Sequence, residues 1–161
     1  MTKFIVDEMH GHIVRWLRIL GFDTLDACDL RKNYVDVDRA ILMVAMKENR
    51  VIVTSDKQLA ARAKRMGLKV VMIEANLDHV GALRKILEEL NIVDEAKQKL
   101  FSRCPMCNGI LVKTNKESVK DKVPSAVLRF HDEFWVCTSC GKVYWVGSHF
   151  KNIRRVLSRI L

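Results

Sequence analysis

The chain has 161 residues, 49% of them hydrophobic, and its 28 Lys and Arg residues against 19 Asp and Glu residues give a formal net charge of +9. This apolar content excludes a disordered chain, and no uncharged stretch is long enough to cross a bilayer. Asp7 and Glu8 stand where a secretory signal needs an apolar core, so we expect a cytoplasmic protein with no membrane partner.

The first ninety residues alternate between short apolar runs and segments of helical periodicity. Strands are expected at residues 4–6, 24–27, 51–54 and 70–73. Helices are expected at residues 13–20, 36–48, 57–66 and 78–90. Strands that alternate with helices predict crossover connections and a mostly parallel sheet. The sequence therefore predicts an α/β domain over residues 1–95.

Two Cys-x2-Cys pairs follow a boundary that we place at residues 95–103. They are Cys104 with Cys107 and Cys137 with Cys140, and 29 residues separate the pairs. Each pair closes a tight turn that presents two thiolates, so two turns complete a tetrahedron around one zinc ion. Because protein side chains fill all four positions, the ion is structural. We expect a small β zinc ribbon over residues 100–150.

The positive charge is concentrated in the second part of the chain. Residues 1–100 carry 17 basic and 15 acidic side chains, whereas residues 101–161 carry 11 basic and four acidic ones. This asymmetry favours contact with a polyanion such as nucleic acid, although a merely soluble basic surface gives the same charge. The last run, residues 151–161, predicts a basic amphipathic helix that packs on the body or lies against RNA.

Three carboxylates occupy positions that suit a metal site. Asp7 directly follows the first apolar run, Asp56 closes the segment of the third, and Asp38 lies at the start of the helix 36–48. Ligands of open parallel sheets bind outside the carboxyl ends of the strands, where Asp7 and Asp56 lie. Two such charges about 5 Å apart repel by roughly 3 kcal/mol at an effective dielectric of 20. A hydrated Mg²⁺ or Mn²⁺ ion removes that cost.

The same carboxylates also have a structural interpretation. Asp36 or Asp38 fits the N-cap of the helix 36–48, and Asp56 fits the N-cap of the helix that begins at Lys57. Asp7 is harder to explain in this way, because an acid that ends a buried strand needs a partner.

Other catalytic patterns are absent from the sequence. There is no nucleophile elbow, no phosphate-binding glycine loop and no G-x-G-x-x-G motif. His10 and His12 follow Asp7, where a substrate contact and a surface position fit equally well. The fifth cysteine, Cys28, has no partner pattern, so we expect a buried structural thiol.

Several segments in this order match one known family. They are Val6-Asp7-Glu8-Met9-His10-Gly11, Arg15 to Gly21, Asp38 with its apolar helix, Arg50 to Asp56, Ser102 to Gly109, Asp132 to Cys137 and Gly141 to His149. In this combination the chain resembles the Mut-seven C-terminal RNase-domain family, and the likeness reaches residue 150. The resemblance implies a PIN-like three-layer α/β domain with a mostly parallel sheet, followed by a small β zinc ribbon.

The resemblance also implies metal-dependent cleavage of RNA. The family's first-strand acid falls on Asp7, its helix acid on Asp38 and its Thr-x-Asp acid on Asp56. Fuller PIN domains carry a further acid on a helix that this chain lacks, for which Asp36 or Asp29 is the available substitute. These carboxylates would hold one or two Mg²⁺ or Mn²⁺ ions, which activate water for attack on the phosphodiester.

Candidate RNA contacts lie on both parts of the chain. We expect Thr54 and Ser55 either to donate hydrogen bonds to a phosphate or to order the acids. Arg15 and Arg18 lie off the apolar face of the helix 13–20, so they point either toward RNA or toward solvent. On the ribbon, Trp135, Tyr144 and Trp145 are expected either to stack on bases or to cover the zinc site. Phosphate pairing fits Lys113, Lys116, Lys120, Lys122, Arg129 and Lys142.

Two classes of function stay open at this stage. The first is a metal-dependent ribonuclease, expected to be an endoribonuclease, with ribosomal RNA processing or a toxin-type activity as variants. The second is a non-catalytic RNA- or ribosome-binding protein whose acids are vestigial. Three acids in the expected places favour the first class.

Overall fold

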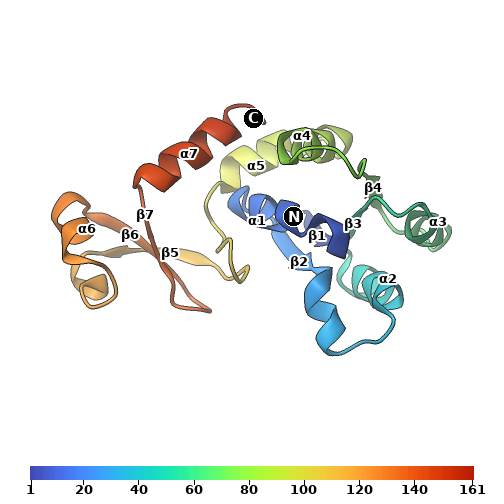
Figure 1. Cartoon of the computed structure of the whole chain (residues 1–161), viewed down its shortest axis with the longest axis horizontal. Helices are drawn as coiled ribbons and strands as arrows, with labels where there is room; N and C mark the ends of the chain where they lie inside the picture. Colours follow the sequence, from blue (N-terminus) through green and yellow to red (C-terminus); the bar gives the residue numbers. More distant parts are fainter.

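Four parallel strands form the central sheet of the computed structural model, which describes residues 1–161 (Figure 1). They are β1 (Lys3–Val6), β2 (Asp23–Asp26), β3 (Val51–Thr54) and β4 (Val70–Met72). The strand order is β2-β1-β3-β4, and all three neighbouring pairs are parallel. The predicted mostly parallel sheet is confirmed.

Helices cover both faces of this sheet. They are η1 (Glu8–His10), α1 (Gly11–Ile19), η2 (Ala27–Lys32), α2 (Val37–Glu48), α3 (Lys57–Arg65), α4 (His79–Glu89) and α5 (Val93–Lys99). Successive strand side chains point to opposite faces. Phe4 and Val6 therefore pack in one core with α1, α4 and α5, and Ile5 packs in a second core with α2 and α3. This confirms the predicted three-layer α/β arrangement.

The ribbon is a separate antiparallel sheet. Its strands are β5 (Leu111–Asn115), β6 (Glu133–Cys137) and β7 (Val143–Trp145), in the order β5-β6-β7. Two short helices, η3 (Glu117–Val119) and α6 (Ser125–Phe130), lie between β5 and β6 in the chain. Val119, Val123 and Phe134 form the small buried core of this part.

The last helix, α7 (Ser148–Leu157), returns from the ribbon to the N-terminal part (Figure 1). Leu157 and Ile160 are buried in the same core as Phe4 and Val6. Of the two predicted placements for this basic helix, the structure therefore shows packing on the body. The predicted boundaries at residues 95 and 151 fall within α5 and α7. None of the helices combines the length and the apolar character that crossing a membrane requires.

Candidate carboxylate site and zinc centre

The first carboxylate, Asp7, lies at the end of β1 and is only 8% exposed. Its Oδ2 accepts a hydrogen bond of 2.7 Å from Thr54 Oγ1, and its Oδ1 accepts one of 2.7 Å from the backbone N–H of Glu8. Thr54 ends β3 and is fully buried. Because β1 and β3 are parallel neighbours, their carboxyl ends meet and bring these two side chains together.

Asp56 is tied to the same threonine from the other side. Its backbone N–H donates to Thr54 Oγ1 at 2.9 Å. Its Oδ1 accepts from the backbone N–H groups of Gln58 at 2.7 Å and Leu59 at 3.0 Å, which makes Asp56 the N-cap of α3. Thr54 therefore links the two acids, and the second carboxylate oxygen of Asp56 stays outside the capping bonds.

The third carboxylate, Asp38, lies in the first turn of α2, whereas Asp36 is the N-cap and accepts from the Arg39 N–H at 3.0 Å. Burial, followed by the negative charges of Asp7 and Asp56, raises the pKa of Asp38 above its ordinary value. Arg62 opposes this shift, with Nη1 lying 3.7 Å from Asp38 Oδ2. Asp38 is thus near enough to Asp7 and Asp56 for both of their negative charges to act on it.

These acids form an open arrangement and not a closed cage. Only one group of three or more His, Cys, Asp or Glu side chains has all its ligand atoms within 4.8 Å of one another, and that group is the four cysteines. Mg²⁺ commonly keeps several waters and binds through one or two carboxylates. The spacing therefore suits a hydrated ion better than one enclosed by protein oxygens.

The cysteine cluster has the geometry of a tetrahedral zinc site. The Sγ–Sγ distance is 3.8 Å between Cys104 and Cys140 and 3.3 Å between Cys107 and Cys137. Four sulfurs at about 2.3 Å from a tetrahedral zinc lie about 3.8 Å apart. The residues present can therefore hold one structural zinc ion, as the spacing of the cysteines predicts.

The surroundings favour the ionised form at Cys137, whereas at Cys107 the backbone N–H of Gly109 lowers the pKa but burial and the neighbouring sulfurs raise it to about 12. Burial disfavours the Cys137 thiolate, but the backbone N–H groups of Cys140 and Ser139 donate to its sulfur, and the pKa of Cys137 is lowered to about 6. Gly109 allows the close approach of the two turns, because a Cβ there would lie 2.5 Å from Ser139 Oγ and 2.7 Å from Cys137 Sγ.

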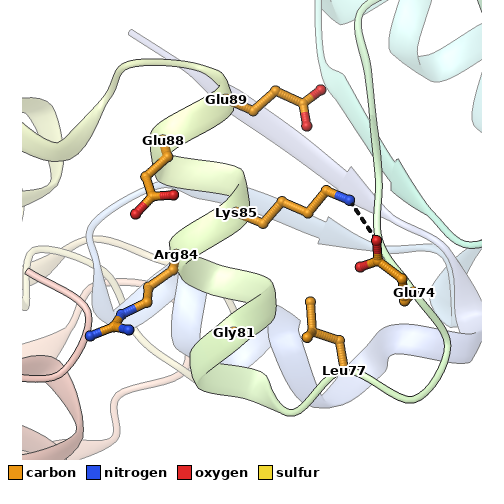
Figure 2. A pocket seen from close by; sticks show the side chains of 7 residues that line it. All are labelled: Glu74, Leu77, Gly81, Arg84, Lys85, Glu88 and Glu89. Atoms are coloured by element: carbon orange, nitrogen blue, oxygen red, sulfur yellow. Dashed lines mark hydrogen bonds and ion pairs between the residues drawn. The ribbon is translucent and has the colours of Figure 1, made fainter.

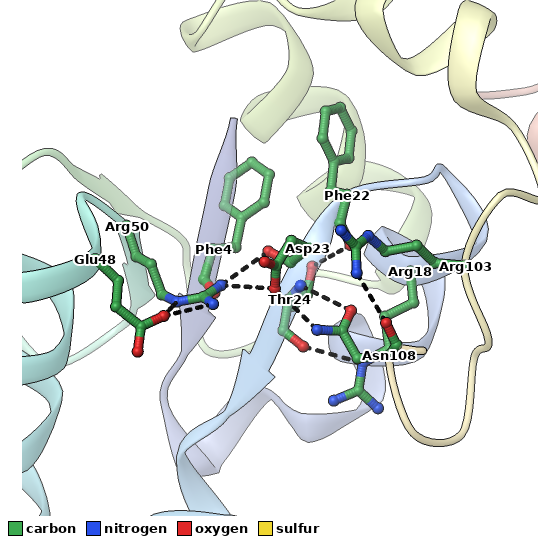
Figure 3. A network of polar contacts seen from close by, with 9 residues as sticks. All are labelled: Phe4, Arg18, Phe22, Asp23, Thr24, Glu48, Arg50, Arg103 and Asn108. Carbon is green, nitrogen blue, oxygen red and sulfur yellow. Dashed lines mark hydrogen bonds and ion pairs between the residues drawn. The ribbon is translucent and has the colours of Figure 1, made fainter. Parts of the chain in front are cut away.

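The first cysteine turn docks on β2, which is an edge strand of the parallel sheet (Figure 3). Asn108 Oδ1 accepts from the Thr24 N–H at 3.1 Å, and Asn108 Nδ2 donates to Asp23 Oδ1 at 2.8 Å. Arg50 Nη1 donates to the same Asp23 oxygen at 2.8 Å from the opposite side. The turn thus pairs a backbone group that an exposed edge would leave free.

A hollow of about 500 Å³ on α4 is not a candidate for the reaction site (Figure 2). Its only apolar lining residue is Leu77, and Lys85 donates to Glu74 at 2.9 Å across it. Arg84 donates to the backbone carbonyl of Arg159. Lys85 and Glu74 are thus paired with each other, and none of the lining residues belongs to the carboxylate group.

The family model of the Mut7-C RNAse domain matches residues 2–157 of the chain. The chain belongs to the Mut7-C RNAse domain family. No match was found among curated proteins or among solved structures. Since the match extends from β1 to the end of α7, the zinc ribbon and the returning helix are as much part of this Mut7-C domain as the α/β layers.

The structure corrects the predicted RNA contact for Arg18 in the Mut7-C domain. Arg18 is 8% exposed, and its guanidinium donates to the carbonyl oxygens of Thr24, Pro105 and Met106. It therefore joins α1, β2 and the first cysteine turn. Thr54 is likewise too deeply buried to reach RNA, and of its two predicted roles the structure shows the ordering of the acids.

The other predicted contacts remain accessible. Arg15 is exposed and lies with Nη2 3.3 Å from His149 Nε2, while Trp135 and Trp145 are half-buried. Ser55 is half-buried, and its Oγ lies 2.9 Å from His10 Nε2. Three of the ribbon lysines are paired with acids, namely Lys113, Lys116 and Lys120.

Two residues, Cys28 and His10, differ from their sequence-based interpretation. Cys28 is exposed and not buried, because Ala27 supplies the buried side chain of η2. His10 is 3% exposed, and burial lowers its pKa. Its place beside Asp7 follows from the sequence, but its burial was not predicted, since a histidine after a strand gives no periodic signal. Asp29, the other possible fourth acid, is exposed and paired with Lys32 at 2.9 Å.

Proposed function

We propose that this Mut7-C RNAse domain is a metal-dependent ribonuclease that cleaves within RNA, with Mg²⁺ or Mn²⁺ held by Asp7, Asp38 and Asp56. The supporting observation is that Thr54 is hydrogen-bonded to two acids at the carboxyl ends of neighbouring strands, while the negative charges of these acids raise the pKa of the third, Asp38. The family supports RNA as the substrate class. The metal, the cut within the strand and the PIN type are part of the proposal.

The chain's own side chains prepare this site for a cation. Asp7 is fixed through both oxygens, so its charge stays in place without a metal. Asp56 is fixed through Oδ1 only, and Asp36 likewise caps α2 through Oδ1, so each keeps one oxygen for an ion or its water. Arg62 is the one cation paired with this group, and the negative charge exceeds it.

A bound Mg²⁺ or Mn²⁺ ion lowers the pKa of a coordinated water and offsets the charge that develops on the scissile phosphate. Thr54 keeps the Asp7 carboxylate oriented toward the strand ends by its hydrogen bond. Beside it, Ser55 Oγ and His10 Nε2 form a hydrogen bond with each other. No protein nucleophile is needed in this mechanism.

The ribbon and its neighbours would hold the RNA. Residues 101–161 remain basic after the −2 charge of a zinc site with four thiolates is counted. Lys122, Arg129 and Lys142 take part in none of the ion pairs of the ribbon. These free cations would pair with phosphates and make RNA affinity fall as salt rises.

The test is cleavage of labelled single-stranded and structured RNAs by the zinc-loaded chain, with added Mn²⁺, with added Mg²⁺ or with neither. Asp7→Asn, Asp38→Asn and Asp56→Asn are expected to abolish metal-dependent cleavage. Asp94→Asn removes an equal charge from an exposed acid of α5 and is expected to leave cleavage unchanged. Cleavage that survives Asp7→Asn would contradict the proposal.

A non-catalytic RNA- or ribosome-binding role is the second candidate. It is favoured by two observations: the three carboxylates are not gathered within 4.8 Å, and two of them, Asp7 and Asp56, serve as helix caps. RNA binding without cleavage in any metal would select this role. Ribosomal RNA or its precursor as the partner, and a cytoplasmic location, stay predictions.

A further inference from the structure

A second cavity, of about 560 Å³, lies where the ribbon, α1 and α7 meet, outside the carboxylate group. Its walls come from α1, the segment after α5, strands β6 and β7, and the start of α7. This volume lies within the range of about 300–1,000 Å³ that is typical of small-ligand pockets. The cavity is therefore large enough for a planar ring system and its attached groups.

The walls of this cavity are rich in aromatic rings. They are supplied by Phe101, Trp135, Tyr144, Trp145 and Phe150. The rings of Phe101 and Phe150 pack against each other, with their centroids 4.5 Å apart. Tyr144 Oη lies 3.1 Å from Cys104 Sγ, within hydrogen-bond distance of a sulfur at the zinc site. The zinc centre and a ring pair thus fix the walls in place.

The charges around the cavity are all of one sign. Its titratable lining residues are basic or neutral, with Arg15, Arg103, Lys142 and His149 present and no Asp or Glu. Arg103 Nε is the only buried side-chain nitrogen or oxygen of the chain that has no hydrogen-bond partner. A buried donor without a partner is unfavourable, and a ligand acceptor that reaches it removes that cost.

We infer that this cavity binds one nucleotide of single-stranded RNA, with the base stacked against the aromatic walls and the phosphate held by the basic rim. The inference rests on the proposed RNA substrate and adds where the strand is held. Aromatic faces stack with any base, and cations pair with the backbone phosphate. A paired base inside a duplex cannot enter, so the cavity selects single strands.

The position of the cavity suits a strand that also reaches the acids. Gly11, the first residue of α1, comes four residues after Asp7, and Arg15 on the same helix lines the cavity. At 1.5 Å per residue, Arg15 lies about 6 Å further along the helix axis than Gly11. Helix α1 therefore connects the two sites directly.

The experiment measures the affinity of fluorescently labelled single-stranded RNA for the full zinc-loaded chain, without Mg²⁺ or Mn²⁺ so that the RNA stays intact. Trp135→Ala is expected to weaken binding roughly 5- to 150-fold, the effect of one lost stacking contact, and Trp135→Phe to retain most of it. Lys142→Ala is expected to reduce the salt dependence by about one ion. Lys64→Ala, with the same charge change at an exposed position of α3, is the matched control.

Arg15→Ala provides a variant that does not disturb the ribbon, because Arg15 is an exposed residue of α1. It is expected to weaken binding, whereas Arg65→Ala on α3 is not. Unchanged affinity in both Trp135→Ala and Arg15→Ala, equal affinity for duplex RNA, or no binding of single strands would each overturn the inference. If cleavage continues in those cases, the proposed function stands and only the inference about the cavity fails. If RNA binding depends on the cavity but no cleavage occurs, the inference about the cavity stands and the proposed function fails.

Discussion

Thr54 Oγ1 donates a hydrogen bond of 2.7 Å to Asp7 Oδ2 from the end of the neighbouring strand. The same oxygen accepts the N–H of Asp56 at 2.9 Å, so one hydroxyl sets the relative position of two acids. The bond to Asp7 holds its carboxylate, whereas the bond to Asp56 holds the backbone of that residue, and both are made by a fully buried side chain. The proposed metal-binding edge is therefore organised by a side chain that is itself no ligand.

Replacing Thr54 by valine tests this role. Thr54→Val keeps the shape but leaves the buried Asp7 Oδ2 without its donor, which is expected to lower the free energy of unfolding by about 1–3 kcal/mol. Cleavage is expected to fall about 10- to 100-fold, as for other residues that orient metal ligands. Thr54→Ser restores the hydroxyl and should recover most of the rate. Full activity in Thr54→Val would show that the hydrogen bond does not position the site.

The pKa of Asp38 reports the proximity of the acids. Because burial and the charges of Asp7 and Asp56 raise it, Asp7→Asn or Asp56→Asn is expected to lower this pKa toward 3.8. Arg62→Gln is expected to raise it further, since Arg62 opposes the shift. The measurement is an NMR titration of the Asp38 carboxyl carbon. An unaltered pKa in both Asn variants would mean that the acids do not form one site.

The same shift has a consequence for stability. A carboxyl whose pKa is raised by folding binds its proton more tightly in the folded state, so its contribution to stability falls as pH rises from 3.8 through the folded pKa. Asp38→Asn is therefore expected to stabilise the metal-free chain at neutral pH. Added Mg²⁺ should remove this difference by stabilising the wild-type carboxylate, which thermal unfolding with and without the ion will measure.

Arg50 is expected to be a major source of stability at the contact between the two parts. Its side chain is 5% exposed and donates to Phe4 O and to Asp23 Oδ1. Arg50→Ala leaves the half-buried Asp23 without its cation and the buried Phe4 carbonyl without this donor, so we expect a loss of about 1–3 kcal/mol in the free energy of unfolding. Arg39→Ala, an exposed arginine, should change it by less than about 0.5 kcal/mol. Similar unfolding midpoints for the two variants would contradict this.

Asp23 gives this contact an acid dependence. Burial raises the pKa of Asp23, but the hydrogen bonds from Arg50 and Asn108 prevail and hold it below 3.8. A lowered pKa contributes stability that is present above pH 3.8 and is lost as pH falls through the folded value. Asp23→Asn should remove this part of the acid-induced loss, as followed by unfolding at a series of pH values.

Removal of zinc is expected to reach the parallel sheet. A structural zinc contributes on the order of 10 kcal/mol to the folding of such a unit, so chelation should unfold the ribbon. The Thr24 N–H then loses its acceptor on Asn108 and should exchange with solvent faster. The Leu59 N–H, bound by Asp56, is the internal control and should stay protected. An unchanged exchange rate at Thr24 after zinc loss would contradict the docking of the turn.

The elements that could be predicted from the sequence depend on local signals. The apolar run 51–54 and the caps at Asp36 and Asp56 lie within a few residues of the structure that they specify. The cysteine spacing is equally local, because each turn presents two ligands of one ion. These features needed no knowledge of the tertiary contacts.

The remaining features depend on distant partners. Arg18 falls off the apolar face of its helix, which indicates solvent, yet its acceptors Pro105 and Met106 are 87 and 88 residues away. His10 likewise depends on Ser55, and no periodicity indicates such a pair. The cavity beside Trp135 needed the placement of α7 on both parts, which the sequence left open.

The burial of Leu157 and Ile160 among the strands of the first domain has a consequence for synthesis. At about 5–20 residues per second, the ribosome needs about 3–12 s to add the roughly sixty residues that follow Leu100. During that interval the apolar surface that later receives α7 is open to chaperones and to other nascent chains. Maturation of this fold is therefore tied to the emergence of its final helix.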